Sequence, residues 1–395
     1  MKVTFLTTSN SRKAGGLFYS VRNLAINVNK IDDISSNILS CNDEFSAEDL
    51  SKYEDLPMPK YSIISFPIIK KLGFSLNIHK VLKFLNPDIV HQQGIWMYHS
   101  NAANNFRKRK ASSKKIITPR GMMDEWLSKN SSATKKLINF WYEQENLQSA
   151  DCFHALNYSE YCSIRKLGFT NPIAIIPNGT TIIEWERSIN HFTNNRKKTL
   201  LFLGRIHSKK GITQLIEALG KIKIASPKIF DKWSVKIAGW EDEGDLLIKL
   251  KQKVIDYDLN NDLQFVGSLY DAQKETALKT VDAFILPSFS EGMPMSILEA
   301  WSYGLPVIMT EYCNLPEGFK LKAAHQIDTN PKLMAEQLIT FLNLNDEELF
   351  EMGQNGKKMV HDNFSWSAVA EKTATLYKWL LDQENHMKPD FVYLT

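Results

Sequence analysis

Two glutamates in the second half of the chain, separated by seven residues, flank a stretch whose backbone could bind an anion. Glu291 falls in a polar loop, and Glu299 falls in an apolar run that begins at Pro294. Because proline suits the first turn of a helix, we expect a helix to start there and to direct the backbone N–H groups of Met295 and Ser296 at the loop. Those groups and the helix dipole attract negative charge. The same pattern is ordinary α/β structure, so this stretch alone leaves both interpretations open.

A second loop carries cations at a spacing suited to a diphosphate. Arg205 and Lys210 bracket the loop between an apolar run at 200–203 and a helical pattern at 212–222. Arginine offers a fork of parallel donors, lysine offers a compact charge, and the following helix offers its N–H groups. This combination predicts a site for a phosphorylated ligand.

Three candidates in the first half lie at or just after the carboxyl ends of predicted strands. Gly16, with Gly15, follows a β-rich run at 2–7 and would let a ligand approach the backbone closely, although an ordinary tight turn is an equally good interpretation. His91 ends a strand, and Arg120 lies in the loop after another strand, where it could bind an acceptor anion. Ligands bind at this end of the strands in open α/β sheets, whereas a structural role is the alternative for His91.

A repeating alternation of strands and helices must position these candidates. The 395 residues exceed the usual size of one domain, and the alternation restarts after a polar stretch at 191–198. We therefore predict two doubly wound α/β domains with parallel sheets, residues 1–190 and 191–377, facing each other across a cleft. We expect a C-terminal helix at about residues 378–395, which can pack back on the first domain.

Composition excludes several classes of protein. Hydrophobic residues make up 43% of the chain and charged residues 23%, as in ordered globular proteins. The four cysteines are scattered without metal-ligand spacing, and we predict reduced, buried thiols and no metal cofactor. No apolar run reaches the length of a membrane span, and residues 1–9 lack the apolar core of a signal peptide. We expect a cytoplasmic protein that can associate with the cytoplasmic face of the membrane.

The first half of the chain is basic and the second is not. Residues 1–180 carry 23 Lys and Arg against 15 Asp and Glu, whereas residues 181–395 carry 25 against 29. Two stretches concentrate the excess: an apolar segment with lysines at 67–85, and the cluster at 107–115. Each suits an anionic membrane or a phosphorylated partner, while a solvated helix surface is the more ordinary interpretation. No nucleic-acid motif accompanies the charge, so nucleic acid is not an expected partner.

Together these motifs resemble the retaining glycosyltransferases of the GT4 type, which have the GT-B fold of two Rossmann-like domains. The resemblance covers nearly the whole chain. Its most specific part is Glu291-Gly-Met-Pro-Met-Ser-Ile-Leu-Glu299, followed by Ala300 and Gly304, which looks like the E-x7-E motif of that family. Its basic companion runs from Gly204-Arg205 to Lys210-Gly211, and supporting matches are Asp88–His91, Pro119–Met122 and Ile176–Gly179.

The resemblance implies a nucleotide-sugar donor bound to the second domain. Glu299 would hydrogen-bond the donor ribose, and Arg205 and Lys210 would hold the diphosphate. The remaining donor-binding residues implied by the family are Gly16 from the first domain, the backbone at Met295 and Ser296, and Gly292 and Met293 beside the sugar. Glu291 and His91 would be the catalytic residues at the sugar. The family often has His-x-His where this chain has His91-Gln-Gln93, which puts the role of the second histidine in doubt.

The implied function is transfer of a sugar, with retention, from a UDP- or GDP-sugar to a glycan acceptor. The basic first half favours a polyprenyl-diphosphate-linked saccharide, as in O-antigen, capsule or exopolysaccharide synthesis, at the cytoplasmic face of the inner membrane. One alternative is a nucleotide-sugar epimerase or hydrolase on the same fold, against which the E-x7-E stretch argues. The other is a protein that binds anions without catalysis. The sequence does not identify the sugar, the nucleotide, the linkage, the acceptor or the oligomeric state.

Overall fold

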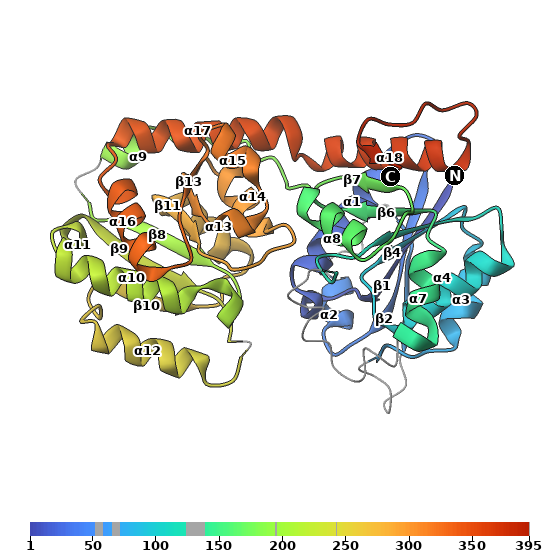
Figure 1. Ribbon diagram of the computed structural model, residues 1–395, viewed down its shortest axis with the longest axis horizontal. Coiled ribbons are helices and arrows are strands. Elements are labelled where there is room, and N and C mark those ends of the chain that lie inside the picture. Colours follow the sequence, from blue (N-terminus) through green and yellow to red (C-terminus); the bar gives the residue numbers. More distant parts are fainter. Residues whose placement is uncertain (52–57, 65–71, 124–138, 194–195, 242, 395) are drawn as a thin grey trace. The chain divides into compact units, whose positions relative to one another are not determined.

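The computed structural model describes the chain except for residues 52–57, 65–71, 124–138, 194–195, 242 and 395. The chain forms two compact units, one of residues 1–179 and 366–395 and the other of residues 180–365. Each unit is built on its own α/β sheet (Figure 1), which confirms the predicted fold class. The cleft expected between the two units stays a prediction.

The borders of the units differ from the predicted borders at residues 190 and 377. Arg187, whose side chain is buried, donates hydrogen bonds to the backbone oxygens of Val281 (2.9 Å) and Leu278 (2.7 Å), so the second unit already includes the segment before 190. Helix α18 (Trp366–Leu381) lies wholly in the first unit, where the hydroxyl of Tyr377 forms a hydrogen bond with His91 of the sheet. Buried polar contacts of this kind, rather than the polarity of the linking segment, decide the borders.

The first unit contains an eight-stranded sheet in the order β14-β7-β6-β5-β4-β1-β2-β3. All neighbouring strands pair in parallel except β14, which is antiparallel to β7. The strands are β1 (Lys2–Ser9), β2 (Ser35–Asn42), β3 (Lys60–Ile64), β4 (Ile89–Gln93), β5 (Lys114–Thr118), β6 (Cys152–Ala155), β7 (Ile173–Ile175) and β14 (Val392–Tyr393). The strand order reverses between β1 and β4, and ligands bind beside the carboxyl ends of strands at such a point.

Helices cover this sheet. Besides α18, they are α1 (Gly16–Val28), α2 (Ser46–Ser51), α3 (Asn77–Leu85), α4 (Tyr98–Arg109), α7 (Gln144–Gln148) and α8 (Tyr158–Lys166), with the short 3₁₀ helix η1 (Arg12–Ala14) and the π-helix η3 (Asn139–Glu143). Helix α1 packs against α18, and α3 packs against α4. The C-terminal chain therefore completes the first unit by covering α1 and by adding β14 to the sheet edge.

The second unit contains a six-stranded parallel sheet in the order β10-β9-β8-β11-β12-β13. Its strands are β8 (Lys198–Leu203), β9 (Trp233–Ala238), β10 (Leu263–Gly267), β11 (Ala283–Leu286), β12 (Val307–Met309) and β13 (Ala324–Gln326). Its helices are α9 (Asn190–Thr193), α10 (Ile212–Ala225), α11 (Ile229–Lys232), α12 (Leu246–Asp256), α13 (Asp271–Thr280), α14 (Met295–Ser302), α15 (Pro316–Lys320), α16 (Pro331–Leu342) and α17 (Asp346–Asn363), with the turns η4 (Ser208–Lys210) and η5 (Glu311–Cys313). The strand order reverses between β8 and β11. The second sheet therefore also has a point at which ligands bind beside the carboxyl ends of the strands.

Helix α14 is anchored by one fully buried side chain. Trp301 donates from Nε1 to the backbone oxygen of Ala323 (2.9 Å). A Cβ atom added at Gly356 of α17 would lie 2.2 Å from the Trp301 ring, and one added at Gly353 would lie 2.1 Å from the backbone oxygen of Gly304. Glycine is therefore required on α17 for this close packing, which holds α14 in place.

Three of the four thiols are buried as predicted, and Cys162 is exposed. Across the residues with described positions, no helix combines the length and the apolar character needed to cross a bilayer.

Candidate active site

Two loops meet at the carboxyl ends of β8 and β11 in the second unit. The backbone N–H of Phe289 donates to the backbone oxygen of Lys209 (2.8 Å), which joins the two loops directly. Gly211 adopts a φ of 69°, and a Cβ atom there would lie 2.0 Å from the backbone oxygen of Pro287. The glycine that follows Lys210 in the sequence is thus the residue that lets the cationic loop approach the acidic one.

This approach brings Lys210 into contact with Glu291. The lysine Nζ lies 2.5 Å from Oε1 of the glutamate, and the hydroxyl of Ser288 donates to the same oxygen at 2.5 Å. Both charged side chains are mostly buried, with 16% and 12% of their surface exposed. The Coulomb attraction between two charges shielded from water is stronger than that in a surface ion pair. An anionic ligand at Lys210 must therefore either compete with Glu291 or share the lysine with it.

The Glu291 loop is also fixed through its backbone. The N–H of Glu291 donates to the backbone oxygen of Tyr312 (3.0 Å), and Nδ2 of Asn314 donates to the backbone oxygen of Glu291 (2.5 Å). Asn314 adopts the left-handed conformation at the end of η5. The carboxylate is consequently held by backbone and side-chain contacts before any ligand arrives.

Glu299 pairs with a different lysine. Its Oε1 lies 2.8 Å from Nζ of Lys274 on α13, and the two side chains are about equally half-buried. Lys274 and Ser288 were not predicted as site residues. Ser288 stands three residues before Glu291, a spacing that could have identified it, whereas Lys274 meets Glu299 only through the packing of two helices.

Helix α14 begins one residue later than predicted, because Pro294 is its N-cap, with φ −77° and ψ 107°. The first backbone hydrogen bond of the helix runs from the N–H of Ile297 to the oxygen of Pro294 (3.1 Å). The N–H groups of Met295 and Ser296 precede that bond, in the position predicted for an anion site. Gly292 and Met293 occupy the loop that leads to this helix end.

Arg205 is exposed at the carboxyl end of β8. Its neighbours are held to β9, since Gly204 N–H donates to the oxygen of Ala238 (3.0 Å) and Ile206 N–H donates to the oxygen of Trp240 (2.8 Å).

The structure therefore gathers all the second-half candidates at one edge of one sheet: Arg205, Lys210, Glu291, Gly292, Met293, Met295, Ser296 and Glu299. Among the positioned residues, no three His, Cys, Asp or Glu side chains form a group that could hold a metal ion.

In the first unit, Gly16 starts α1 directly after Gly15, whose φ is 58°. A Cβ atom added at either glycine would meet no atom within 4 Å. The space beside this turn is open, as close approach of a ligand to the backbone requires.

His91 does not occupy an accessible position. Its side chain has no exposed surface, Nδ1 lies 2.6 Å from the hydroxyl of Tyr377, and Nε2 lies 2.8 Å from the hydroxyl of Thr118 and 3.2 Å from Nδ1 of His154. Burial, His154 and Arg120 all hold the pKa of His91 well below its usual value. In this geometry His91 joins α18 to the sheet, and the predicted contact with a sugar has no support. The physical reason is that β4 is covered on both faces, so its alternating side chains are all buried.

The first unit is expected to lose stability as the pH falls below about 6.5. Burial keeps the pKa of His154 at about 3 and that of His99 at about 4, whereas unfolded histidine binds a proton near 6.5. The unfolded chain therefore gains protons first on acidification. Each such histidine lowers the unfolding free energy by up to about 1.4 kcal/mol per pH unit between these values.

Urea unfolding between pH 7 and pH 5 measures this dependence. We expect a shallower slope in His154→Gln, whatever its stability at pH 7, and an unchanged slope in His361→Gln, which alters an exposed histidine. A slope in His154→Gln equal to that of the wild type would contradict the prediction.

Arg120 is held at the sheet edge by two amides. Its Nε and Nη2 donate to Oε1 of Gln93 (3.0 and 2.7 Å), and its Nη1 donates to Oδ1 of Asn178 (2.5 Å). Burial lowers the pKa of Arg120 to about 10, so it stays cationic at neutral pH. Arg120 has a φ of 59°, and Glu160 supports this loop by accepting from the backbone N–H of Gly121 (2.6 Å). The sequence analysis missed Glu160.

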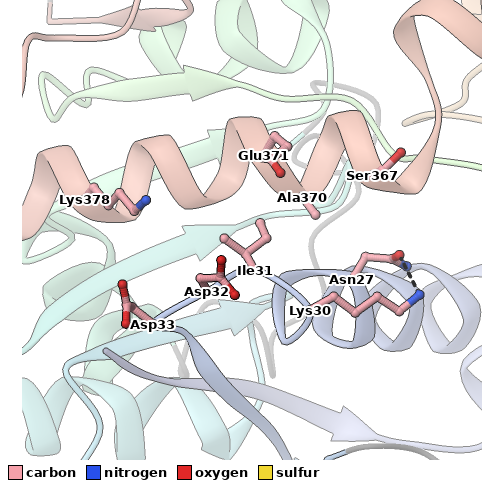
Figure 2. A pocket seen from close by; sticks show the side chains of 9 residues that line it. All are labelled: Asn27, Lys30, Ile31, Asp32, Asp33, Ser367, Ala370, Glu371 and Lys378. Atoms are coloured by element: carbon pink, nitrogen blue, oxygen red, sulfur yellow. Dashed lines mark hydrogen bonds between the residues drawn. The ribbon is translucent and has the colours of Figure 1, made fainter.

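A pocket of about 360 Å³ lies elsewhere in the first unit (Figure 2). It is lined by α18, by the carboxyl end of α1 and by the turn between α1 and β2, with acidic side chains (Asp32, Asp33 and Glu371) beside basic ones (Lys30 and Lys378). None of the predicted site residues lines it. The pocket is thus separate from the loops at the carboxyl ends of the strands.

The chain has two parallel-sheet α/β units, each with candidate ligand loops at the carboxyl ends of its strands, and this architecture is the GT-B fold. Residues 184–359, somewhat less than half of the chain, match the family described as Glycosyl transferases group 1. The matched segment contains Glu291 and Glu299 of the E-x7-E stretch. It also contains Arg205 and Lys210 of the basic loop.

Curated relatives include proteins that are named as glycosyltransferases. An uncharacterized glycosyltransferase of Methanocaldococcus jannaschii is 28% identical over 55% of this chain and 57% of its own length, so the chain spans little more than half of that relative. Glycogen synthase of Mycobacterium tuberculosis is 24% identical over 78% of this chain and 71% of its own. An Escherichia coli enzyme named UDP-Gal:alpha-D-GlcNAc-diphosphoundecaprenol alpha-1,3-galactosyltransferase is 28% identical over 62% of both chains.

Solved structures share the fold at low identity. Sucrose-phosphate synthase from Thermosynechococcus elongatus superposes with a TM-score of 0.77 at 17% identity, over 97% of this chain and 100% of that one. HepE from Anabaena, in complex with UDP and glucose, superposes with a TM-score of 0.74 at 15% identity, over 96% and 99%. At these identities the likeness establishes the fold alone.

Proposed function

We propose that the protein is a retaining glycosyltransferase that moves a sugar from a nucleotide-sugar to a polyprenyl-diphosphate-linked saccharide in surface-polysaccharide synthesis. The observation that carries the proposal is the convergence of Lys210, Glu291 and the amino end of α14 at one edge of the second sheet. The polysaccharide assignment is supported by the names of the relatives, which include enzymes of colanic acid and amylovoran biosynthesis.

In this proposal the donor lies across the two loops of the second unit. Lys210 and Arg205 hold the diphosphate, and the N–H groups of Met295 and Ser296 cap it. Glu299 accepts from the ribose hydroxyls, in place of its present contact with Lys274. Glu291 lies at the sugar with Gly292 and Met293, where its carboxylate faces the carbon at which the bond to the leaving phosphate breaks.

The chemistry requires stabilisation of the nucleoside diphosphate as it departs. Fixed cations and oriented N–H groups act on that developing charge without having to reorganise, which is the largest catalytic effect such a site can offer. The proposed reaction uses Lys210, Arg205 and the α14 amino end in this role and uses no metal cofactor. Retention follows if the acceptor attacks from the face that the phosphate leaves, and Glu291 then stabilises positive charge on the sugar.

The acceptor is proposed to bind the first unit, with Arg120 near its anionic group. Gly16 keeps its predicted role as a donor-binding residue. Arg120 uses three of its donor atoms on Gln93 and Asn178, which fixes the orientation of the guanidinium. A catalytic role for His91 is not part of the proposal, because His91 is fully buried.

Peripheral contact with the cytoplasmic face of the inner membrane is proposed for α3. Its exposed face combines the charges of Lys80 and Lys83 with the apolar side chains of Phe84 and Leu76, which are 79% and 56% exposed. Lys70 and Lys71 of the predicted basic segment lie outside the described residues. The second predicted cluster is not a continuous patch, since its members Arg107 and Lys115 are engaged by Asp151 and by buried amides.

The double variant Lys80→Ala, Lys83→Ala is expected to bind anionic vesicles at least about 10-fold more weakly, at roughly 1 kcal/mol for each lysine near such a surface. Sedimentation with vesicles of phosphatidylglycerol and phosphatidylethanolamine measures the partition. Lys358→Ala, which removes a 79% exposed lysine of the second unit, is the matched control and should bind like the wild type. Equal binding by all three proteins would rule out α3 as the contact.

The function itself is tested by thermal unfolding with a panel of UDP-, GDP- and dTDP-sugars. A ligand of the native state raises the midpoint by mass action. We expect one nucleotide class to stabilise the protein, and the same nucleotide-sugar to be consumed only when a lipid-linked acceptor is added. Consumption without an acceptor would instead identify a hydrolase or an epimerase.

A further inference from the structure

An exposed aromatic ring stands at the carboxyl edge of the first sheet. Tyr158 opens α8, directly after the carboxyl end of β6, and 65% of its surface is exposed. A large side chain so exposed loses the burial that normally stabilises an aromatic residue. Its position in the fold is therefore of interest.

The ring is held in one orientation by a column of side chains along α8. Tyr158 stacks on Tyr161 with ring centroids 5.4 Å apart and an interplanar angle of 22°. Behind Tyr161 lie the guanidinium of Arg165, 5.3 Å from the ring centroid, and the ring of Tyr393, at 5.1 Å. Arg165 is fixed in turn by donating to the backbone oxygens of Phe169 (2.9 Å) and Tyr393 (3.1 Å).

One ring face of Tyr158 is thus covered by the column, and the surface left exposed is presented by a rigid support. The electrostatic effect of the Cys162 sulfur, one turn further along the helix, and its hydrogen bond with the hydroxyl raise the pKa of Tyr158. Tyrosine offers a large contact area with few rotatable bonds, so a fixed tyrosine binds a flat partner at little entropic cost.

Tyr158 also belongs to the same edge as the proposed acceptor residues. Glu160, two residues along the helix, accepts from the N–H of Gly121, which follows Arg120. Its second carboxylate oxygen accepts from Leu156 N–H (2.8 Å). The aromatic column and the Arg120 loop are therefore joined through one buried carboxylate.

We propose that the outer face of the Tyr158 ring is a stacking site for a sugar ring of the acceptor. One face of a pyranose presents C–H groups, which suit the electron-rich face of an aromatic ring, and its hydroxyls stay at the rim in water. The proposal rests on the proposed function for the identity of the acceptor. It differs from a role in helix stability alone, which would require the Tyr158–Tyr161 pair and no open face.

Glycan binding by the full chain without nucleotide tests this site. The probes are the methyl β-glycosides of glucose, galactose and N-acetylglucosamine, observed by saturation-transfer NMR. We expect transfer to the C–H protons of at least one glycoside in the wild type, in Tyr158→Phe and in Tyr158→Trp, and at least fivefold less in Tyr158→Ala. Leu167→Ala, which alters an exposed aliphatic side chain just after the same helix, is the matched control.

Thermal unfolding checks that Tyr158→Ala is folded, and its stabilisation by nucleotides is measured separately. Loss of glycan contact with nucleotide binding intact supports the site. Equal transfer in wild type and Tyr158→Ala overturns it, as does equal loss in Leu167→Ala, absence of transfer in the wild type, or loss of vesicle binding in Tyr158→Ala with glycan contact unchanged. Failure of the proposed function would appear instead as absence of nucleotide binding in every variant, with the glycan result standing on its own.

Discussion

Replacing Glu291 by glutamine is expected to lower turnover at saturating donor by about 100-fold, or roughly 2.7 kcal/mol in activation free energy. Glutamine keeps the shape of the side chain and can still accept from Lys210 and Ser288, which both contact Oε1 at 2.5 Å. It lacks the negative charge that would stabilise the sugar in the transition state. Affinity for the nucleoside diphosphate should stay the same or rise a few-fold, because Lys210 no longer has a competing carboxylate.

The matched variant is Lys210→Met, which removes the other half of the pair. It should weaken binding of the nucleoside diphosphate by about 10-fold to 100-fold, as for a lost hydrogen bond to a charged group, and lower turnover as well. Ser288→Ala, which leaves both charges in place, is the control with a smaller expected effect. Calorimetric titration of UDP and GDP, with initial rates, measures both quantities. A loss of nucleotide affinity in Glu291→Gln equal to that in Lys210→Met would contradict the separation of roles.

Glu299→Ala is expected to weaken donor binding by about 10-fold to 100-fold with little change in turnover at saturation. A carboxylate that accepts hydrogen bonds from a ribose contributes roughly 1.5–3 kcal/mol, and this contact is made equally in the ground state and the transition state. The measurement is the dissociation constant of the donor together with kcat.

Lys274→Met separates the ligand contact from the ion pair. It removes the partner that Glu299 has in this structure, at 2.8 Å, and leaves the carboxylate in place for the ribose. We expect its donor affinity to lie within a few-fold of the wild type. Equal donor affinity in the wild type and Glu299→Ala would exclude the ribose contact.

Most of the fold of the second unit could be predicted from local pattern. The strand at Ala283–Leu286, the helix at Met295–Ser302 and the strand at Val307–Met309 follow the apolar runs and the proline that the sequence analysis used. The two candidate loops could be placed at one sheet edge because parallel strands of a doubly wound sheet end on the same side. Their direct contact through Gly211 and Pro287 could not, because it depends on how closely the two backbones approach.

The first unit shows where local pattern fails. His91 lies near the carboxyl end of a strand, which favours a ligand role, but the strand is buried on both faces and Tyr377, 286 residues away, covers the imidazole. The same contact explains why the C-terminal helix belongs to the first unit from Trp366 and not from 378. Lys274 and Glu160 were likewise missed, since each acquires its role from a residue on a separate element.

The sequence by itself determined the two α/β units, the loops that carry Arg205, Lys210 and Glu291, and the helix that carries Glu299. These features depend on short-range preferences: apolar periodicity, proline at a helix start and glycine in turns. Only the tertiary structure decided which charges meet. It paired Lys210 with Glu291 and Glu299 with Lys274, and it buried His91 while leaving Tyr158 exposed. Such pairings depend on distances between elements far apart in the chain, on which periodicity carries no information.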